Sequence, residues 1–127
     1  MKLLLDTHTA LWLVNEHEKL SSKAKAVLLD NANAIYLSIV SLWEIAIKVS
    51  IGKLLLPGGA RVFITKLHDM PIELLPITPL QVDIVESLPF IHRDPFDRMI
   101  VATAKAEGLA ILTNDENIHR YDVSSIW

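Results

Sequence analysis

The 127-residue chain contains no cysteine. Disulfide bonds and thiolate metal sites are therefore excluded, and nothing in the composition favours an oxidising compartment over the cytoplasm. Glycine is also scarce, with only four in the chain, and none belongs to a phosphate-binding loop pattern. We therefore expect a cytoplasmic protein without a nucleotide cofactor.

A long uninterrupted apolar run is missing as well. The N-terminal segment reaches Asp6 before the apolar core of an export signal can develop, and the apolar stretch 34–51 is interrupted by Glu44 and Lys48. Neither an export signal nor a membrane span is expected.

The charges are nearly balanced, with a net charge of −3. This balance disfavours a protein that coats nucleic acid through a broad basic face. It does not exclude an enzyme that cuts nucleic acid. If divalent cations neutralised four of the 15 acidic residues, 12 basic residues would face only 11 acidic ones.

Apolar residues are abundant, at 51% of the sequence with a mean hydropathy of +0.35. This length and composition predict a single domain that spans residues 1–127 and has a substantial core. They also leave more apolar side chains than one small core readily hides, which predicts a homodimer.

Short apolar runs alternate with longer segments of helical periodicity. This alternation predicts an α/β fold with a central, mainly parallel β-sheet flanked by helices. The expected strands are 2–6, 34–38, 71–75 and 109–113, with a last short one within 123–127. The expected helices are 7–15, 22–31, 39–51, 60–69, 79–87 and 95–107.

Two acids and two arginines surround the start of the helix expected at 95–107. Asp94 can cap this helix, Pro95 has a backbone angle suited to its first position, and Asp97 then points from the first turn. Asp94 and Asp97 also resemble a capping box with the shorter acid, which is a purely structural alternative.

Three further acids stand near the carboxyl ends of predicted strands. Asp6 and Asp115 directly follow strands, while Glu44 lies in the first half of a helix entered from the same edge. In open parallel sheets, the functional crevice lies outside the carboxyl ends of the strands. We therefore expect Asp6, Glu44, Asp97 and Asp115 to converge there.

Simpler roles exist for these three acids too. Asp6 and Asp115 could each cap the element that follows, and Ser41 with Glu44 fits a capping box. Glu44 is harder to dismiss, because it lies with Lys48 in a segment as apolar as a core helix, where an unpaired carboxylate is costly. The simplest partner for the four acids is a hard divalent cation, Mg²⁺ or Mn²⁺.

Basic and aromatic residues supply the remaining candidates. Arg93 and Arg98 are candidates for phosphate contact, with surface salt bridges as the alternative, and His92 is a candidate for substrate contact or a loop hydrogen bond. Trp12 and Trp43 are expected in the core. Zinc is not expected, because the histidines show no paired ligand spacing. They are His8, His17, His68, His92 and His119.

Four motifs together resemble those of PIN-domain proteins, and more closely the VapC-type ribonuclease toxins of prokaryotic toxin–antitoxin pairs. The likeness covers essentially the whole chain in order and length. The run at 92–98 is the most specific motif, and the others gain weight from their order. The motifs are Leu5-Asp6-Thr7-His8, Ser41-Leu42-Trp43-Glu44-Ile45, His92-Arg93-Asp94-Pro95-Phe96-Asp97-Arg98 and Leu112-Thr113-Asn114-Asp115.

The resemblance implies a three-layer PIN-like fold, a homodimer, and a cognate antitoxin with a segment that covers or enters the site. It implies an acidic metal-binding cluster, with Thr7 and Thr113 as supporting polar groups and Asp94 as an accessory acid. The implied metal-binding and catalytic acids are Asp6, Glu44, Asp97 and Asp115.

The function that follows is metal-dependent hydrolysis of RNA phosphodiester bonds by Mg²⁺ or Mn²⁺ held on carboxylates. A PIN-like domain that processes RNA, or an inactive one that only binds a partner, is the alternative. A phosphatase with Asp6 as nucleophile is disfavoured, because the second acid expected two residues later is replaced by His8.

Overall fold

Strand β1 (Lys2–Leu5) lies at the centre of the sheet, and its three leucines are completely buried. The computed structural model describes all 127 residues. The other strands are β2 (Ala34–Ser38), β3 (Ile72–Leu75), β4 (Ala110–Leu112) and β5 (Ser125–Ile126). The strand order is β3-β2-β1-β4-β5, and all neighbours are parallel. The predicted parallel sheet is therefore confirmed.

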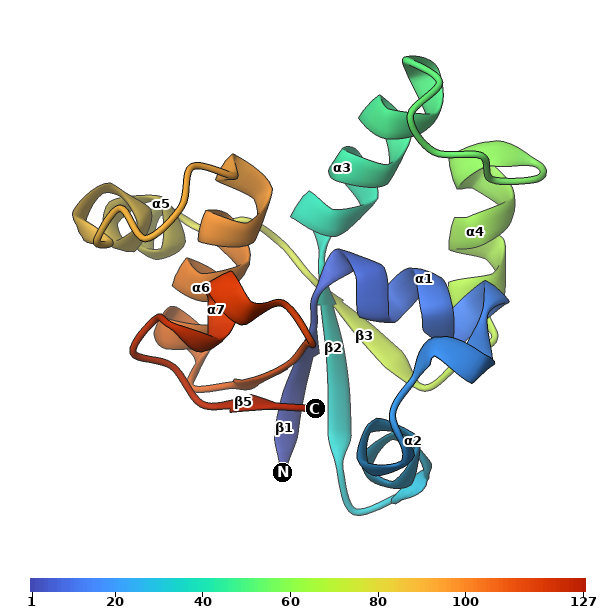
Figure 1. Ribbon diagram of the computed structural model, residues 1–127, viewed down its shortest axis with the longest axis horizontal. Helices are drawn as coiled ribbons and strands as arrows, with labels where there is room; N and C mark the ends of the chain where they lie inside the picture. The colour runs from blue at the N-terminus through green and yellow to red at the C-terminus, as the bar shows by residue number, and fades with distance from the viewer.

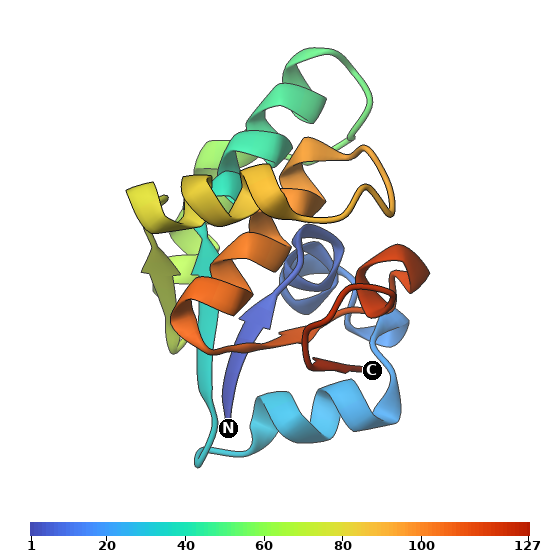
Figure 2. The same cartoon turned by 90° about the vertical axis from the view of Figure 1, so that its left-hand side faces the viewer.

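Helices cover both faces of this sheet and make three layers (Figure 1). Leu3 and Leu5 face a core shared with the helices on one side, and Leu4 faces the core on the other side. One layer holds α1 (Thr7–Asn15), α2 (Ser22–Leu29) and α4 (Gly59–His68), and the other holds α5 (Pro79–Ser87), α6 (Pro95–Glu107) and α7 (Glu116–His119). Figure 2 shows α5 and α6 in front of the sheet.

Helix α3 (Ile39–Ser50) belongs to neither layer alone, because it rises from the carboxyl end of β2 (Figure 1). Its Val40 packs into the core of α6, and its Ile45 packs into the core of α1. Ser38 starts the helix by accepting a hydrogen bond from the Val40 N–H at 3.1 Å. The helix therefore stands over the edge where the strands end.

Helix α6 begins and ends as its sequence predicts. Asp94 is its N-cap, Pro95 is its first residue, and Gly108 closes it in the left-handed conformation at φ 67°. This conformation is accessible to glycine without a steric penalty, so the chain can turn back there into β4. Asp97 thereby lies in the first turn of α6.

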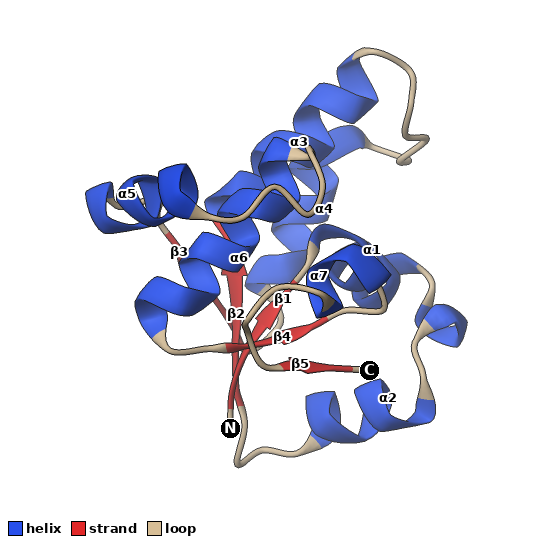
Figure 3. Cartoon of the chain, turned by 60° about the vertical axis from the view of Figure 1, so that its left-hand side comes forward, coloured by secondary structure: helices blue, strands red, loops and turns tan.

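Most predicted elements are confirmed, but two short ones were not predicted. These are the 3₁₀-helix η1 (His17–Lys19) and α7, which lies beside the carboxyl ends of the strands (Figure 3). The helix predicted at 22–31 stops at Leu29, because Asp30 accepts a hydrogen bond from the Ala32 N–H and makes a turn. No helix combines the length and the apolar character of a membrane span.

The prediction for one tryptophan is wrong. Trp12 is half-buried against the core, as expected, but Trp43 is 58% exposed and contacts Phe96 edge-on at 5.3 Å between ring centroids. The helical period of α3 places Trp43 on the side away from the sheet, while Ile45 faces the core. Because α3 stands on the sheet edge, that outer side remains uncovered.

Candidate functional site

Asp6 directly follows β1 and is buried at the carboxyl edge of the sheet. Its Oδ1 accepts from the Thr9 N–H at 2.8 Å, which caps α1. Its Oδ2 accepts from the hydroxyl of Thr113, which follows β4. The cap proposed as a simple role for Asp6 therefore exists, but it uses only one of the two carboxylate oxygens.

Glu44 points from α3 into the same buried edge, with only 3% of its side chain exposed. The Thr7 hydroxyl donates to Glu44 Oε1 at 2.6 Å and lies 3.0 Å from the Ser41 hydroxyl. Lys48 Nζ donates to Glu44 Oε2 at 2.6 Å. The capping box of Ser41 and Glu44 is a wrong alternative, because the N-cap of α3 is Ser38 instead.

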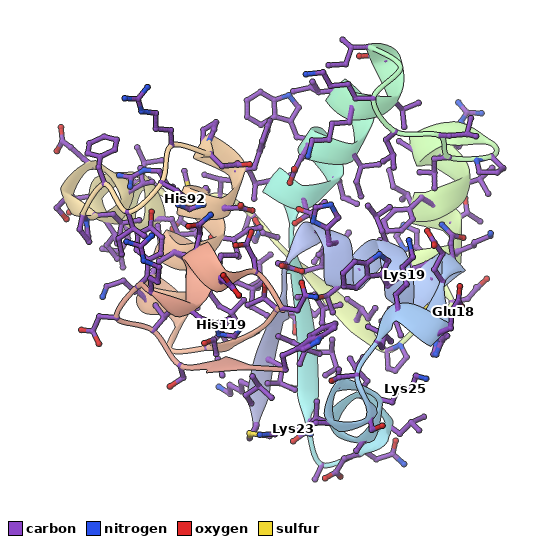
Figure 4. All side chains as sticks on the ribbon, viewed as in Figure 1. Glu18, Lys19, Lys23, Lys25, His92 and His119 are labelled. Atoms are coloured by element: carbon purple, nitrogen blue, oxygen red, sulfur yellow. The ribbon has the colours of Figure 1, made fainter.

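Asp94 and Asp97 behave differently, although both lie at the start of α6. Asp94 Oδ1 accepts from the N–H groups of Phe96 and Asp97, at 2.9 and 3.1 Å. Asp97 does not return a hydrogen bond to the cap, so the capping-box alternative fails here too. Its Oδ2 instead lies 3.3 Å from Nε2 of His92, which sits on the loop that enters α6 (Figure 4).

Asp115 completes the set from the segment that follows β4. Its Oδ1 accepts from the Asn117 N–H at 2.8 Å and caps the single turn of α7. Its own N–H donates to the Thr113 hydroxyl at 3.0 Å. Thr113 thus connects Asp115 to Asp6, and two acids from neighbouring strands share one supporting hydroxyl.

The electrostatics show that these acids lie near one another. The pKa of Asp97 is raised to about 8, first by burial and then by the negative charges of Asp94, Asp115, Glu44 and Asp6. Like charges raise a carboxyl pKa because the ionised form is repelled. The four acids therefore lie close enough to act on one another electrostatically, and their assignment as one site remains a prediction.

Two other groups at the site have shifted pKa values. Burial raises the pKa of Asp6, and hydrogen bonds from its threonine partners only partly offset this. Burial alone would lower the pKa of Lys48, but its hydrogen bond to Glu44 and the charges of Glu44, Asp94 and Asp97 raise it overall. Lys48 is therefore held as a cation against the acids.

The donor atoms at this edge suit a hard divalent cation, because they are carboxylate and hydroxyl oxygens. No three histidine, cysteine, aspartate or glutamate side chains are arranged to hold a metal ion together. The absence of such an arrangement is compatible with the mutual repulsion of the acids. Charge repulsion acts over several ångströms, whereas the oxygens that ligate one ion lie about 2.0–2.6 Å from it. The donor set fits Mg²⁺ or Mn²⁺ in its chemistry, while each carboxylate is hydrogen-bonded to its own chain.

The prediction that Arg98 contacts phosphate is wrong, because Arg98 is only 6% exposed and points into the protein. Its guanidinium donates hydrogen bonds to acceptors inside the protein and lies over the ring of Phe90, 4.2 Å from the ring centroid. Arg93 is exposed and remains a candidate. The acceptors for Arg98 are the carbonyls of Val85, Leu88 and Pro89 and the hydroxyl of Tyr121.

Sequence reasoning missed three residues of this site. Lys48 could have been found, because it lies four residues after Glu44 and opposite charges at that spacing meet on one helix face. Ser41 lies three residues before Glu44, but its contact with Thr7 depends on how α1 meets α3. Tyr121 gave no signal, because its contact with His92 joins residues 29 positions apart.

Several solved structures of other proteins share the fold of this chain. VapBC2 from Rickettsia felis bound to a promoter DNA fragment has a TM-score of 0.74 at 20% identity, with 99% of this chain and 98% of that chain covered. DNA-bound VapBC from Salmonella typhimurium has a TM-score of 0.71 at 19% identity, with 99% and 97% covered. FitAcB from Neisseria gonorrhoeae has a TM-score of 0.67 at 21% identity, with 98% of this chain and 96% of that chain covered.

The chain matches a protein family, although no single curated sequence is similar to it. No curated protein sequence matches the chain significantly. The identities to the solved structures are low, so these likenesses support the fold. A family model described as the PIN domain, however, matches residues 3–124, which is nearly the whole chain. The protein therefore belongs to the PIN domain family.

Proposed function

We propose that this protein is a divalent-metal-dependent ribonuclease and the toxin of a toxin–antitoxin pair. The observation that carries the proposal is the gathering of acids from four separate segments around Asp97, whose pKa is raised to about 8 first by burial and then by the negative charges of those acids. Of the cations in the chain, Lys48 forms an ion pair with one of these acids. Such crowding destabilises a protein without metal, so a function is the best reason for it.

The four acids have distinct positions in the proposed site. Asp6 and Asp115, which follow β1 and β4, would hold the cation together with Glu44 of α3 and Asp97 of α6. When bound, Mg²⁺ or Mn²⁺ supplies activation of water and stabilisation of charge on the phosphate. The protein's own contribution is to orient these carboxylates through its threonine hydroxyls.

Those orienting groups are visible in the structure. Thr113 holds Asp6 Oδ2 and the backbone of Asp115, and Thr7 holds Glu44 Oε1. Each hydroxyl occupies one side of an acceptor oxygen and limits the rotation of the carboxylate. Asp94 supports the site indirectly, because it caps the helix that carries Asp97. Exposed Arg93 is the proposed contact for an RNA phosphate.

The similar structures suggest the partners. They are VapBC and FitAcB complexes, so we propose a cognate antitoxin for this chain. Two of those complexes contain DNA, but we do not propose that this chain binds DNA, because its net charge is −3. We also propose a homodimer, because Trp43, Leu55 and Phe90 leave 58%, 94% and 81% of their surface exposed. Light scattering at micromolar concentration should give the mass of a dimer, and a monomer mass would contradict this.

Cleavage of single-stranded RNA by the Asp97→Asn variant tests the proposed activity. The change keeps the size of the side chain but removes an anionic ligand, so activity with Mg²⁺ or Mn²⁺ should fall at least about 100-fold. Asp83→Asn, on the exposed side of α5, is the matched control and should cut normally. Cleavage that persists in Asp97→Asn, or that survives chelation of the metal, would overturn the proposal. A wild type that cuts no RNA but binds its antitoxin would indicate a binding module.

A further inference from the structure

A line of hydrogen bonds runs from the end of α5 to the acidic site. Arg98 Nη1 donates to the Tyr121 hydroxyl oxygen at 3.2 Å. The same hydroxyl lies 2.8 Å from Nδ1 of His92, and Nε2 of His92 lies 3.3 Å from Oδ2 of Asp97. Two side chains, Tyr121 and His92, thus connect the buried guanidinium of Arg98 to the proposed metal ligand Asp97.

The chemistry of these groups gives the line a direction. A guanidinium can only donate, so the Tyr121 oxygen must accept from Arg98. The single hydroxyl hydrogen of Tyr121 is then free to point at Nδ1 of His92. With Nδ1 as acceptor, the neutral imidazole carries its hydrogen on Nε2 and donates it to Asp97. The arrangement therefore selects one tautomer of His92.

Each member of the line is held in place by its surroundings. Tyr121 and Arg98 are 4% and 6% exposed, and 13% of the His92 side chain is exposed. The other bonds of Arg98 go to carbonyls of Val85, Leu88 and Pro89, at the end of α5 and the start of the loop that carries His92. The rings of His92 and Tyr121 also meet edge-on at 5.5 Å.

We infer that Tyr121 is a positioning residue that fixes the tautomer and orientation of His92, and that His92 in turn aims the carboxylate of Asp97. This inference rests on the proposed metal-dependent function. Asp97 is repelled by the acids around it, and His92 is the one side chain that holds it by a hydrogen bond. A donor on Oδ2 therefore decides where Oδ1 points, as hydrogen bonds to ligating carboxylates commonly do.

The first test measures Mn²⁺ affinity by calorimetry rather than by activity. Tyr121→Phe keeps the packed ring, and Arg98 keeps its carbonyl partners, so the fold should survive. Loss of the hydroxyl should weaken Mn²⁺ binding about 10-fold. Tyr36→Phe is the matched control, because Tyr36 packs against the same core on β2 but lies outside the line of hydrogen bonds. It should bind Mn²⁺ like the wild type.

Two variants of His92 test the direction of the line. The amide nitrogen of His92→Gln can stand in for Nε2 and keep the donor to Asp97. His92→Asn is too short and places its amide near Nδ1, so it should lose that donor. We expect His92→Asn to weaken Mn²⁺ binding about 10-fold or more, and His92→Gln to retain most of the affinity. Equal affinities for the two variants would overturn the inference.

A nitrogen NMR spectrum of metal-free protein gives a readout that a merely structural role would not move. Wild type should show His92 with its hydrogen on Nε2, and Tyr121→Phe should show a mixture of tautomers. An unchanged tautomer together with unchanged Mn²⁺ affinity in Tyr121→Phe would overturn the inference. The proposed function fails separately, if Asp97→Asn binds Mn²⁺ as tightly as the wild type.

Discussion

Asp97 and Arg98 are adjacent on α6, yet their charges are treated in opposite ways. Arg98 is buried with four internal acceptors and a ring beneath its guanidinium. Asp97 has 17% of its side chain exposed, one hydrogen bond from a histidine, and four like charges around it. One charge is satisfied by the fold, and the other is left to repel its neighbours.

The contrast assigns neighbouring residues of one helical turn to different roles, Arg98 to the stability of the fold and Asp97 to the proposed site. The acceptors of Arg98 are mainly the carbonyl of Val85 in the last turn of α5 and the carbonyls of Leu88 and Pro89 just after it. Arg98 thereby joins α5 to α6 and stabilises the fold. Asp97 does nothing comparable for the metal-free protein, so its position is best explained by a ligand.

Removing Arg98 should have the largest effect on stability. Arg98→Met keeps an apolar stem but leaves the Leu88 carbonyl without a donor and takes one hydrogen bond from three further oxygens, so the free energy of unfolding should fall by about 3 kcal/mol or more. Urea unfolding followed by circular dichroism measures this. Arg61→Met, at an exposed position of α4, is the control and should stay within about 0.5 kcal/mol of the wild type. A similarly small loss for Arg98→Met would mean that its bonds do not join α5 to α6.

Neutralising Asp97 should have the opposite effect and increase the stability of the metal-free protein as the pH rises. Its pKa is raised from 3.8 to about 8 on folding. The folded state therefore holds a proton that the unfolded state releases between about pH 4 and 8, and wild-type stability falls as the pH rises through this window. Asp97→Asn removes that slope, so without metal it should match the wild type near pH 4.

At pH 8 the same variant should be more stable than the wild type, because ionising Asp97 beside its acidic neighbours costs free energy that an amide does not incur. Thermal melts in the presence of a chelator, at several pH values, measure the difference. If Asp97→Asn melts lower than the wild type at pH 8, Asp97 is a structural residue and the comparison with Arg98 fails. Added Mn²⁺ should stabilise only the wild type, because the variant lacks the anionic ligand.

Local sequence patterns predicted much of the fold for identifiable physical reasons. The leucines of β1 predict a strand buried on both faces, and the cap and proline at 94–95 predict the exact start of α6. The short helix α7 has too few residues for a periodic pattern, and only its cap, Asp115, was visible. Local rules therefore identified the elements and their ends.

The same rules could not decide which side chains meet across the fold. Arg98 was expected at the surface because arginine is usually exposed, but the packing of α5 against α6 buries it. The partners of His92 were equally invisible, because Tyr121 reaches it from the far end of the chain. Asp6, Asp97 and Asp115 could be proposed from the sequence because each stands at the end or start of an element, where sequence position and place in space coincide, and Glu44 because it is a charge within an apolar helix.

Lys48 gives the smallest expected effect and tests whether the acidic region is built for a cation. Its ammonium holds Glu44, which is buried, while Lys48 itself is about one-third exposed. Lys48→Met should lower metal-free stability by about 1 kcal/mol at most, because solvent screens the lysine. Lys19→Met breaks an ion pair with Glu16 at similar spacing, but both of those side chains are about half exposed, so it should change almost nothing.

Saturating Mn²⁺ should then reduce the loss of stability in Lys48→Met, because a bound cation supplies the countercharge that Glu44 has lost. Thermal melts of both variants with and without Mn²⁺ provide the measurement. A loss in Lys48→Met that Mn²⁺ leaves unchanged would place Glu44 outside the metal site and reduce its ion pair to a structural contact.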